Sequence, residues 1–421
     1  MKKIYTLSEV ADLLGKSKET LRRWDNSGKL TAVREPMSNY RVYRKEQLKI
    51  FDELDFLFNT EDSGNQIKPD RDYSVLELFA GAGGLAIGLE KAGLKCIALN
   101  EIDHWAAETL RINRPNWKVI EADIRDVSFK DHEGKIDVVT GGFPCQAFSY
   151  AGKKLGLKDA RGTLFYEFAR IVNETKPLLC IGENVRGLLN HDGGRTLRGM
   201  KSILDEIGYK PLDEKILKAI FYKVPQKRER LILVGIRKDI DIDFGFPKPY
   251  NKVYNLKDAL KAGELYSTDV QESEGTKYPK RKKEILTKIP PGGYWRDLPL
   301  KLQKEYMQKS FYLGGGKTGM ARRISWDEPS LTLTCSPAQK QTERCHPDET
   351  RPFTVKEYAR IQTFPDDWKF AGSVSQRYKQ IGNAVPVNLA KEIGYSIVKF
   401  LNTTYKEYQL SDRNQLAMAF E

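Results

Sequence analysis

Five short apolar runs, each ending near a glycine or an acid, constrain the fold of this 421-residue chain most strongly. Helical patterns follow several of these runs, and strands that alternate with helices form parallel sheets. A parallel strand buried on both faces has a nearly continuous apolar sequence, as these runs do. The pattern predicts an α/β core with a doubly wound sheet. The runs occupy residues 73–79, 95–99, 119–124, 136–139 and 178–182.

A glycine-rich turn follows the first run, with the sequence Ala-Gly-Ala-Gly-Gly at 80–84 before a predicted helix at 85–92. Glycines let a ligand approach the backbone and leave helix N–H groups pointing at it. Glu101 ends the second run, where an acid can accept hydrogen bonds from ribose hydroxyls, and Asp123 ends the third. These features outline an adenosine-shaped site, although a dinucleotide or a simple tight connection would fit the glycine turn equally well. The lysine of a phosphate-binding loop is absent, which argues against an NTPase.

Cys145 lies directly after the fourth run, in the sequence Gly-Gly-Phe-Pro-Cys-Gln at 141–146. Pro144 fixes its own φ and holds Phe143 extended, so the thiol sits on a stiff backbone, as a nucleophile requires. Taken alone, a single cysteine is more often a small apolar residue. Glu183 follows the fifth run, so the thiol and a carboxylate are expected at one rim of the sheet.

The net charge of +13 is concentrated in two segments. Residues 1–50 carry +6 and residues 277–323 carry +10, so the remainder is slightly acidic. Two basic segments favour a polyanion, most simply nucleic acid, while solvated lysines remain the alternative for either segment alone.

Cysteine and histidine are too few and scattered to predict a disulfide framework or a metal site. The nearest approach to a ligand set is Cys345-His346 with Cys335 ten residues earlier. Apolar runs stay well short of the ~18 residues of a membrane span, so we expect a cytoplasmic protein that binds neither metal nor membrane.

The N-terminal segment predicts two short helices joined by a tight turn, at 6–15 and 18–24, followed by a small β wing. It resembles the winged helix-turn-helix of MerR-type regulators and phage excisionases over residues 4–50. Arg22, Arg23 and Arg41 are the expected DNA contacts, although such a module can also serve only for docking or dimerisation. A polar linker follows at 59–72.

Five motifs occur in the order and approximate spacing of the cytosine-C5 DNA methyltransferases, which the chain resembles over residues 73–401. They are Phe-Ala-Gly-Ala-Gly-Gly at 79–84, Gly-Phe-Pro-Cys-Gln at 142–146, Glu-Asn-Val at 183–185, Gln-Lys-Arg-Glu-Arg at 226–230 and Gln-Ile-Gly-Asn-Ala-Val at 380–385. The resemblance implies a Rossmann-like, S-adenosylmethionine-dependent enzyme of the bacterial restriction-modification type. Its partners would be double-stranded DNA and a cognate restriction endonuclease.

The resemblance also transfers site residues to this chain. Ile102 occupies a position where a bulkier side chain often stacks on adenine, so weaker apolar packing is expected there. The implied catalytic residues are Pro144, Cys145, Glu183, Arg228 and Arg230. The implied cofactor-binding residues are Phe79, Ala80, Gly81, Gly83, Gly84, Glu101, Ile102, Asp123, Ile124, Asn383 and Val385.

The chemistry of this family explains those residue types. C5 of cytosine is a weak nucleophile until a thiolate, here Cys145, adds at C6. Glu183 would bind N3 and the 4-amino group, while Arg228 and Arg230 would hold O2 and nearby phosphates. The base must leave the duplex to be reached, and loop 146–154, with Gln146 and Ser149 as DNA contacts, would close over it.

The remaining segments complete the prediction. Residues 212–224 and 230–237 are two β-rich runs, the second expected at a sheet edge, and helix 386–401 should pack beside the first strand. Residues 244–325 lose the α/β alternation and form the expected target-recognition region, with DNA between the lobes. Its expected DNA contacts are Arg296, Lys317, Arg322 and Arg323. The predicted domains are 1–58, 73–243 with 326–405, and 244–325.

Two alternatives to a DNA methyltransferase remain open at this point. One is an RNA cytosine-5 methyltransferase with a similar core, against which the basic recognition-like segment and the helix-turn-helix argue. The other is a transcription regulator with an inactive methyltransferase half, against which Cys145, Glu183 and Arg228 argue.

Overall fold

The computed structural model describes residues 3–36, 39–58, 66–144 and 163–418, with side chains up to residue 409. The chain divides into two compact units. The smaller contains Met1–Gly64 and Lys248–Lys252, and the larger contains Asn65–Pro247 and Val253–Glu421. The recognition region therefore stays within the larger unit apart from residues 248–252, and the finer domain boundaries remain predictions.

The smaller unit has the predicted pair of helices and a small antiparallel sheet of order β1-β3-β2. Thr6 caps the first helix because its hydroxyl accepts from the Glu9 amide, while the Glu9 carboxylate accepts from the Thr6 amide at 2.8 Å. Gly15 ends this helix in the left-handed conformation, with φ 64°. The elements are β1 (Ile4–Thr6), α1 (Leu7–Leu14), α2 (Lys18–Asn26), β2 (Val33–Arg34) and β3 (Arg41–Arg44), followed by 3-10 turns at 45–50 and 52–57.

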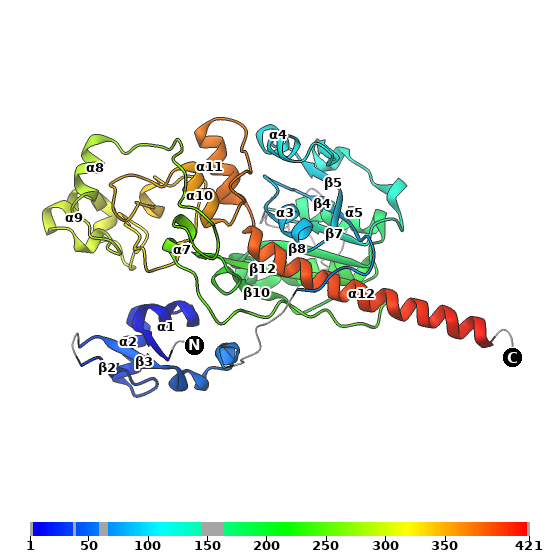
Figure 1. Cartoon of the computed structure of the whole chain (residues 1–421), viewed down its shortest axis with the longest axis horizontal. Helices are drawn as coiled ribbons and strands as arrows, with labels where there is room; N and C mark the ends of the chain where they lie inside the picture. The colour runs from blue at the N-terminus through cyan, green and yellow to red at the C-terminus, as the bar shows by residue number, and fades with distance from the viewer. Residues whose placement is uncertain (1–2, 37–38, 59–65, 145–162, 419–421) are drawn as a thin grey trace. The chain divides into compact units, whose positions relative to one another are not determined.

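The larger unit is built on a central sheet of order β10-β12-β8-β7-β4-β5-β6, with β9 also paired to β12 (Figure 1). The strands from β8 to β6 are parallel, and β12 pairs antiparallel with β8, β9 and β10. The predicted doubly wound α/β core is confirmed. The strands of the central sheet are β4 (Ser74–Leu78), β5 (Lys95–Glu101), β6 (Val119–Glu121), β7 (Val138–Gly141), β8 (Leu179–Val185), β9 (Tyr209–Pro211), β10 (Lys215–Lys218) and β12 (Glu229–Arg237). β11 (Gln226–Lys227) and β13 (Ser330–Leu331) form a separate two-stranded parallel sheet.

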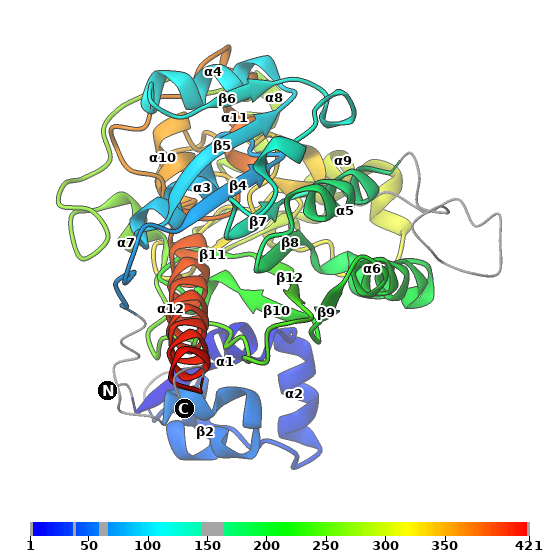
Figure 2. The same ribbon diagram turned by 90° about the vertical axis from the view of Figure 1, so that its right-hand side faces the viewer.

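Helices cover both faces of this sheet (Figure 2). α5 and α6 pack on one face, where Phe168 and Ile203 share a core with Leu76 and Leu78 of β4. α3 lies on the other face, in a second core with Leu99 of β5. The helices are α3 (Gly84–Lys91), α4 (His104–Asn113), α5 (Leu164–Thr175), α6 (Arg195–Glu206), α7 (Leu256–Leu260), α8 (Lys280–Leu286), α9 (Leu300–Met307), α10 (Val355–Ile361), α11 (Val374–Asn383) and α12 (Val387–Met418).

The edge position predicted for the run 230–237 is wrong. β12 lies inside the sheet, paired on one side with β8 and on the other with β9 and β10. Seven consecutive residues of β12, 230–236, are buried, as expected for a strand covered on both faces and both edges. The run predicted at 212–224 is also shorter, because β10 ends at Lys218 and a 3-10 turn follows at 219–221.

The long helix α12 returns to the start of the core, as predicted, and packs against α3. The hydroxyl of Tyr73, just before β4, donates to Asn402 of α12 at 2.7 Å. Glycines allow the two helices to approach closely: a Cβ at Gly88 would lie 2.3 Å from the Cβ of Ala390, and one at Gly394 would lie 2.6 Å from that of Ala92. None of the described helices is both long and apolar enough to cross a membrane.

We predict that Gly88→Ala lowers the free energy of unfolding by about 1–3 kcal/mol, because the added methyl group would force α3 and α12 apart. Urea unfolding of the full chain measures the change. Gly263→Ala is the matched control, since a Cβ there meets no atom within 4 Å. Equal midpoints for the two variants would contradict the proposed helix contact.

Candidate functional site

A cavity of about 840 Å³ lies at the carboxyl ends of the parallel strands. Most of the site residues predicted from the sequence line it together: Phe79, Ala80, Gly81, Gly84, Glu101, Ile102, Asp123, Ile124, Pro144, Glu183, Arg228, Arg230, Asn383 and Val385. Gly83 lies just behind this wall, in the left-handed conformation that begins α3. Cys145, Gln146 and Ser149, with the rest of loop 146–154, fall outside the described residues.

The glycine turn forms one end of the cavity. Gly81 and Gly83 have φ of 56° and 84°, and Phe79 adopts φ 57°, which is rare for a bulky residue. Gly84 faces the segment 383–385 so closely that a Cβ would lie 2.3 Å from the Val385 carbonyl oxygen. The turn and the segment between α11 and α12 therefore meet so closely that Gly84 cannot carry a side chain.

Glu101 holds this turn in place from the end of β5. Its buried carboxylate accepts three backbone N–H groups, from Gly81 at 2.7 Å, Ile102 at 2.9 Å and Asp103 at 2.7 Å. Burial raises the pKa of Glu101, while these three hydrogen bonds act in the opposite direction. A carboxylate offers about four lone-pair sites, so Glu101 can accept one more donor from a ligand.

Asp123 faces the same end from the loop after β6, and its carboxylate is bound by Arg125. Arg125 donates Nε to Oδ1 at 2.9 Å and Nη2 to Oδ2 at 2.5 Å. This hydrogen-bonded pairing lowers the pKa of Asp123 to about 2, so the group is ionised at neutral pH. Ile102 adds an apolar surface beside it, with 65% of the residue exposed.

The other end of the cavity carries the predicted catalytic groups. Glu183 of β8 forms an ion pair with Arg230 of the neighbouring strand β12. Asn184 points the opposite way and donates Nδ2 to the carbonyl of Phe143 at 2.8 Å, which fixes the backbone just before Pro144 and Cys145. The carboxylate and the start of the cysteine loop are thus positioned by adjacent residues of one strand.

Arg228 lies beneath this end and is only 2% exposed. Its guanidinium donates to the carbonyls of Leu333 at 3.1 Å, Gly382 at 3.0 Å and Asn383 at 3.4 Å. Burial lowers its pKa to about 9, and among the described residues its Nε has no hydrogen-bond partner. Arg228 therefore joins three parts of the cavity wall and keeps one buried donor for a further acceptor.

Several cavity residues were not predicted from the sequence. Glu77 lies two residues before Phe79 on β4, and Lys379 lies one helical turn before Asn383, so strand and helix periodicity could have found both. Thr334 and Cys335 reach the cavity through the turn after β13, and the sequence carries no comparable signal for them.

The DNA contacts predicted in the smaller unit have different surroundings. Arg22 and Arg23 are exposed on α2, where Arg22 pairs with Glu19 at 3.1 Å. Arg41 forms an ion pair with Asp25 at 2.5 Å, and only 23% of its side chain is exposed. Arg41 thus binds the wing to the end of α2 and presents less of its charge to solvent than the other two.

Arg322 and Arg323 are corrected by the structure, because they are only 9% and 4% exposed. Arg322 binds both oxygens of Glu328, at 2.5 and 2.6 Å, and Arg323 donates to the carbonyls of His346, Pro347 and Leu286. Both are therefore scaffold residues rather than DNA contacts. Arg296 is exposed beside Trp295, and the Lys317 ammonium binds the carbonyls of Ser310 and Leu313.

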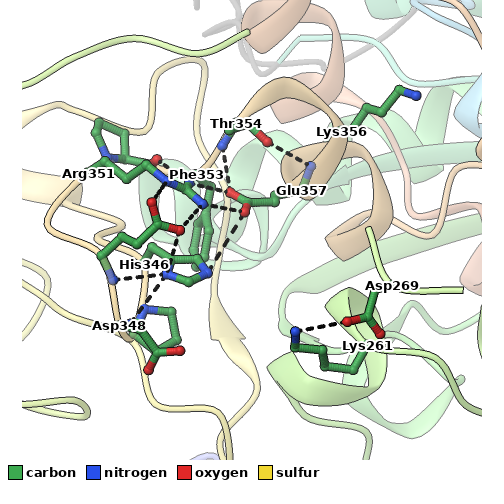
Figure 3. Close-up of polar contacts among 12 residues, drawn as sticks. Lys261, Asp269, His346, Asp348, Arg351, Phe353, Thr354, Lys356 and Glu357 are labelled. Atoms are coloured by element: carbon green, nitrogen blue, oxygen red, sulfur yellow. Dashed lines mark hydrogen bonds and ion pairs between the residues drawn. The ribbon is translucent and has the colours of Figure 1, made fainter. Parts of the chain in front are cut away.

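His346 is part of a polar network that supports this scaffold (Figure 3). Its Nδ1 accepts the amides of Asp348 at 3.3 Å and Glu349 at 3.2 Å, so the proton is on Nε2, which faces Glu357 at 3.8 Å. Arg351 binds both oxygens of Glu357 at 2.8 Å. No group of residues in the described part of the chain could hold a metal ion.

We predict that acidification destabilises the larger unit through His346. Burial lowers the pKa of His346 below its ordinary value of 6.5, so below that pH the unfolded chain takes up a proton more readily than the folded one. His346→Asn should therefore show a smaller fall in thermal midpoint between about pH 7.5 and 5.5 than the unaltered chain. The control is His104→Asn, an exposed histidine, and an unchanged fall in the His346 variant would refute the prediction.

The model of the C-5 cytosine-specific DNA methylase family matches residues 73–399. The chain belongs to that family. The MerR family regulatory protein model matches residues 6–43, in agreement with the predicted helix-turn-helix.

Known relatives cover nearly the whole chain. It is 64% identical over 408 residues to the Type II methyltransferase M.Eco47II of Escherichia coli, covering 96% of this chain and 98% of that protein. It is 58% identical to M.PspPI of Psychrobacter sp. (strain TA137), with the same two shares covered. A solved putative DNA modification methyltransferase from an E. coli prophage shares the fold, with 23% identity, a TM-score of 0.61, and 79% of this chain and all of that one covered.

Proposed function

We propose that this chain is a site-specific DNA (cytosine-5-)-methyltransferase of a restriction-modification system. The observation that carries the proposal is one cavity with a glycine turn and two acids at one end and Glu183, Arg230 and Pro144 at the other. The similarity to proteins named Type II methyltransferases supports methyl transfer as the reaction, and it supports pairing with a cognate restriction endonuclease.

The residues around the glycine turn fit S-adenosyl-L-methionine, which supplies an electrophilic methyl group when bound. Glu101 can accept one further donor, such as a ribose hydroxyl, the ionised Asp123 can accept from an adenine amino group, and Ile102 offers an apolar surface for the ring. The close approach of Gly84 to Val385 leaves the backbone itself as the wall there. Asn383, at the end of α11, completes this end of the site.

The other end of the cavity fits the target cytosine. The Cys145 thiolate adds to C6 as Glu183 shares its proton with N3, which moves electron density to C5. Arg230 holds one oxygen of Glu183, so the carboxyl group keeps its orientation towards the base. C5 would then take the methyl group from the sulfonium of S-adenosyl-L-methionine, which leaves as S-adenosyl-L-homocysteine. A water molecule takes the C5 proton, the N3 proton returns to Glu183, and expulsion of the Cys145 thiolate restores the aromatic ring.

The base has to leave the helix for this reaction. C6 of a cytosine that is stacked in a duplex cannot be reached by an enzyme nucleophile, so the nucleotide is turned out of the duplex. The unpartnered Nε of Arg228 supports this, because a buried donor near Glu183 suits an acceptor such as the cytosine O2.

We predict that cells expressing the chain acquire 5-methylcytosine at one position of one short DNA word, measured by base-resolution sequencing. Cys145→Ala should abolish the mark because the nucleophile is lost. Glu183→Gln should lower the rate at least about a hundredfold, since the proton at N3 is lost. Glu229→Gln, which alters an ion pair with Arg186 outside the cavity, should stay within about twofold.

Either of two outcomes would contradict this function. Unmarked DNA with methylated cytosine in RNA would favour the RNA methyltransferase. Soluble protein that methylates neither nucleic acid but binds a promoter would favour a regulator with an inactive methyltransferase half.

For the N-terminal unit we propose DNA binding, with repression of its own operon as the role. The MerR-type match and the exposed Arg22 and Arg23 on α2 support this. Such residues contact phosphates and base edges when the second helix enters the major groove.

We predict that Arg22→Ala with Arg23→Ala weakens binding to DNA upstream of the gene at least tenfold, about 1.4 kcal/mol, in a gel-shift assay, while methylation changes less than about twofold. The control is Lys45→Ala with Lys49→Ala, which removes the same charge away from α2. A similar loss in both pairs would show a general electrostatic effect, and a large loss of methylation would show that the unit also serves catalysis.

A further inference from the structure

An ion pair joins α4 to α11 at the edge of the cavity. Asp103 caps α4, and Lys379 lies on α11 one turn before Asn383. The Lys379 ammonium donates to Oδ2 of Asp103 at 2.7 Å, and both residues line the cavity. The Lys379 side chain is 51% exposed and that of Asp103 is 25% exposed. The pair therefore connects two walls of the cavity at a place that solvent reaches.

Asp103 is also part of the network that positions Glu101. Its backbone amide donates to Oε1 of Glu101 at 2.7 Å. Its Oδ1 accepts the amides of Trp105 at 3.1 Å and Ala106 at 3.2 Å, which are the first free donors of α4. One residue thus fixes the start of α4 with its side chain and orients the Glu101 carboxylate with its backbone.

Both members of the ion pair are charged at neutral pH. Burial alone would raise the pKa of Asp103, but the hydrogen bonds from Lys379 and from the helix amides lower it overall. The hydrogen bond to Asp103 raises the pKa of Lys379. An ion pair that is partly exposed contributes up to about 1 kcal/mol, and salt screens it.

Two further polar contacts hold α4 against the C-terminal part of the chain. The buried Thr109 donates to Gln380 at 2.6 Å and accepts the amide of Ala371 at 2.8 Å. Asn113 exchanges two hydrogen bonds with the backbone of Lys369, at 2.7 and 2.8 Å. These contacts are uncharged and lie farther along α4, so the helix would stay attached without the ion pair and would loosen only at its start.

The walls that the ion pair connects carry residues of the donor end of the cavity. Ile102 lies between Glu101 and Asp103, and Ala106 lies in the first turn of α4. Asn383 lies at the end of α11, and all of these residues line the cavity. A movement of the start of α4 would therefore displace several of the groups that a ligand meets there.

We propose that Lys379 is a positioning residue for the methyl donor. It acts through Asp103: the ion pair holds the start of α4 and the Glu101 carboxylate in the arrangement that binds the donor, and Lys379 itself does not touch the donor. The inference rests on the proposed S-adenosyl-L-methionine-dependent function. Because the ion pair is partly exposed, donor affinity gains a component that depends on ionic strength.

The test is the binding of S-adenosyl-L-homocysteine, which cannot react, to the full chain in titration calorimetry without DNA. Lys379→Met should weaken binding about fivefold, and Lys379→Arg should keep most of the affinity because it keeps the charge. Asp103→Asn should give a similar loss, since asparagine is a good N-cap residue but lacks the charge. The double variant should lose no more than either single one, because both changes break the same pair.

Lys369→Met is the matched control, because it removes an exposed lysine of the same segment whose backbone alone contacts Asn113 of α4. Its affinity should stay within about twofold. At about 0.5 M salt the loss caused by Lys379→Met should shrink to less than about twofold, since screening weakens the pair in the unaltered chain. The thermal midpoint of each ligand-free variant should stay within about 3 °C.

Unchanged affinity in Lys379→Met would overturn the inference. Additive losses in the double variant would also overturn it, because they would mean that Lys379 contacts the donor directly, and so would a large fall in the ligand-free thermal midpoint, which would show a general structural role. If the unaltered chain does not bind S-adenosyl-L-homocysteine, the proposed function fails, which is a different result from a loss confined to the variants.

Discussion

The buried guanidinium of Arg228 is the interaction on which the cavity depends. It lies just before β12 and binds the turn after β13, 105 residues later, and the end of α11, 154 and 155 residues later. A guanidinium that is 2% exposed is costly to bury, and only its set of carbonyl acceptors makes this possible. These hydrogen bonds offset the cost of burial, and they also fix the three parts of the cavity wall relative to one another.

Ion pairs and carboxylate hydrogen bonds position most of the polar groups in the cavity. Glu101 is held by backbone amides, Asp123 by Arg125 and Glu183 by Arg230. Groups fixed in this way need little rearrangement when a charged ligand arrives, which is the electrostatic preorganisation that catalysis uses. The glycine turn leaves its backbone unobstructed by side chains, so a ligand can come close to it.

The core strands could be predicted because each is an uninterrupted apolar run, and the acids and glycines at their ends follow from the parallel order. Which strands pair with one another could not be predicted, and β12 was therefore wrongly expected at an edge of the sheet. Arg322 and Arg323 show a second limit. The sequence alone does not tell whether an arginine binds a DNA phosphate or groups of its own chain, as these two do. Lys379 could be found from helical spacing, whereas Thr334 and Cys335 depend on a turn whose position only the folded chain defines.

The meeting of Gly84 with Val385 has a consequence for protein synthesis. Gly84 and Val385 are about 300 residues apart in the sequence. A ribosome adds roughly 5–20 residues per second, so Val385 is synthesised roughly 15–60 s after the glycine turn. The nascent chain has no complete cavity during that time. A product truncated before Gly382 would keep the strands and their acids yet lack Asn383 and Val385, which complete the wall of the site.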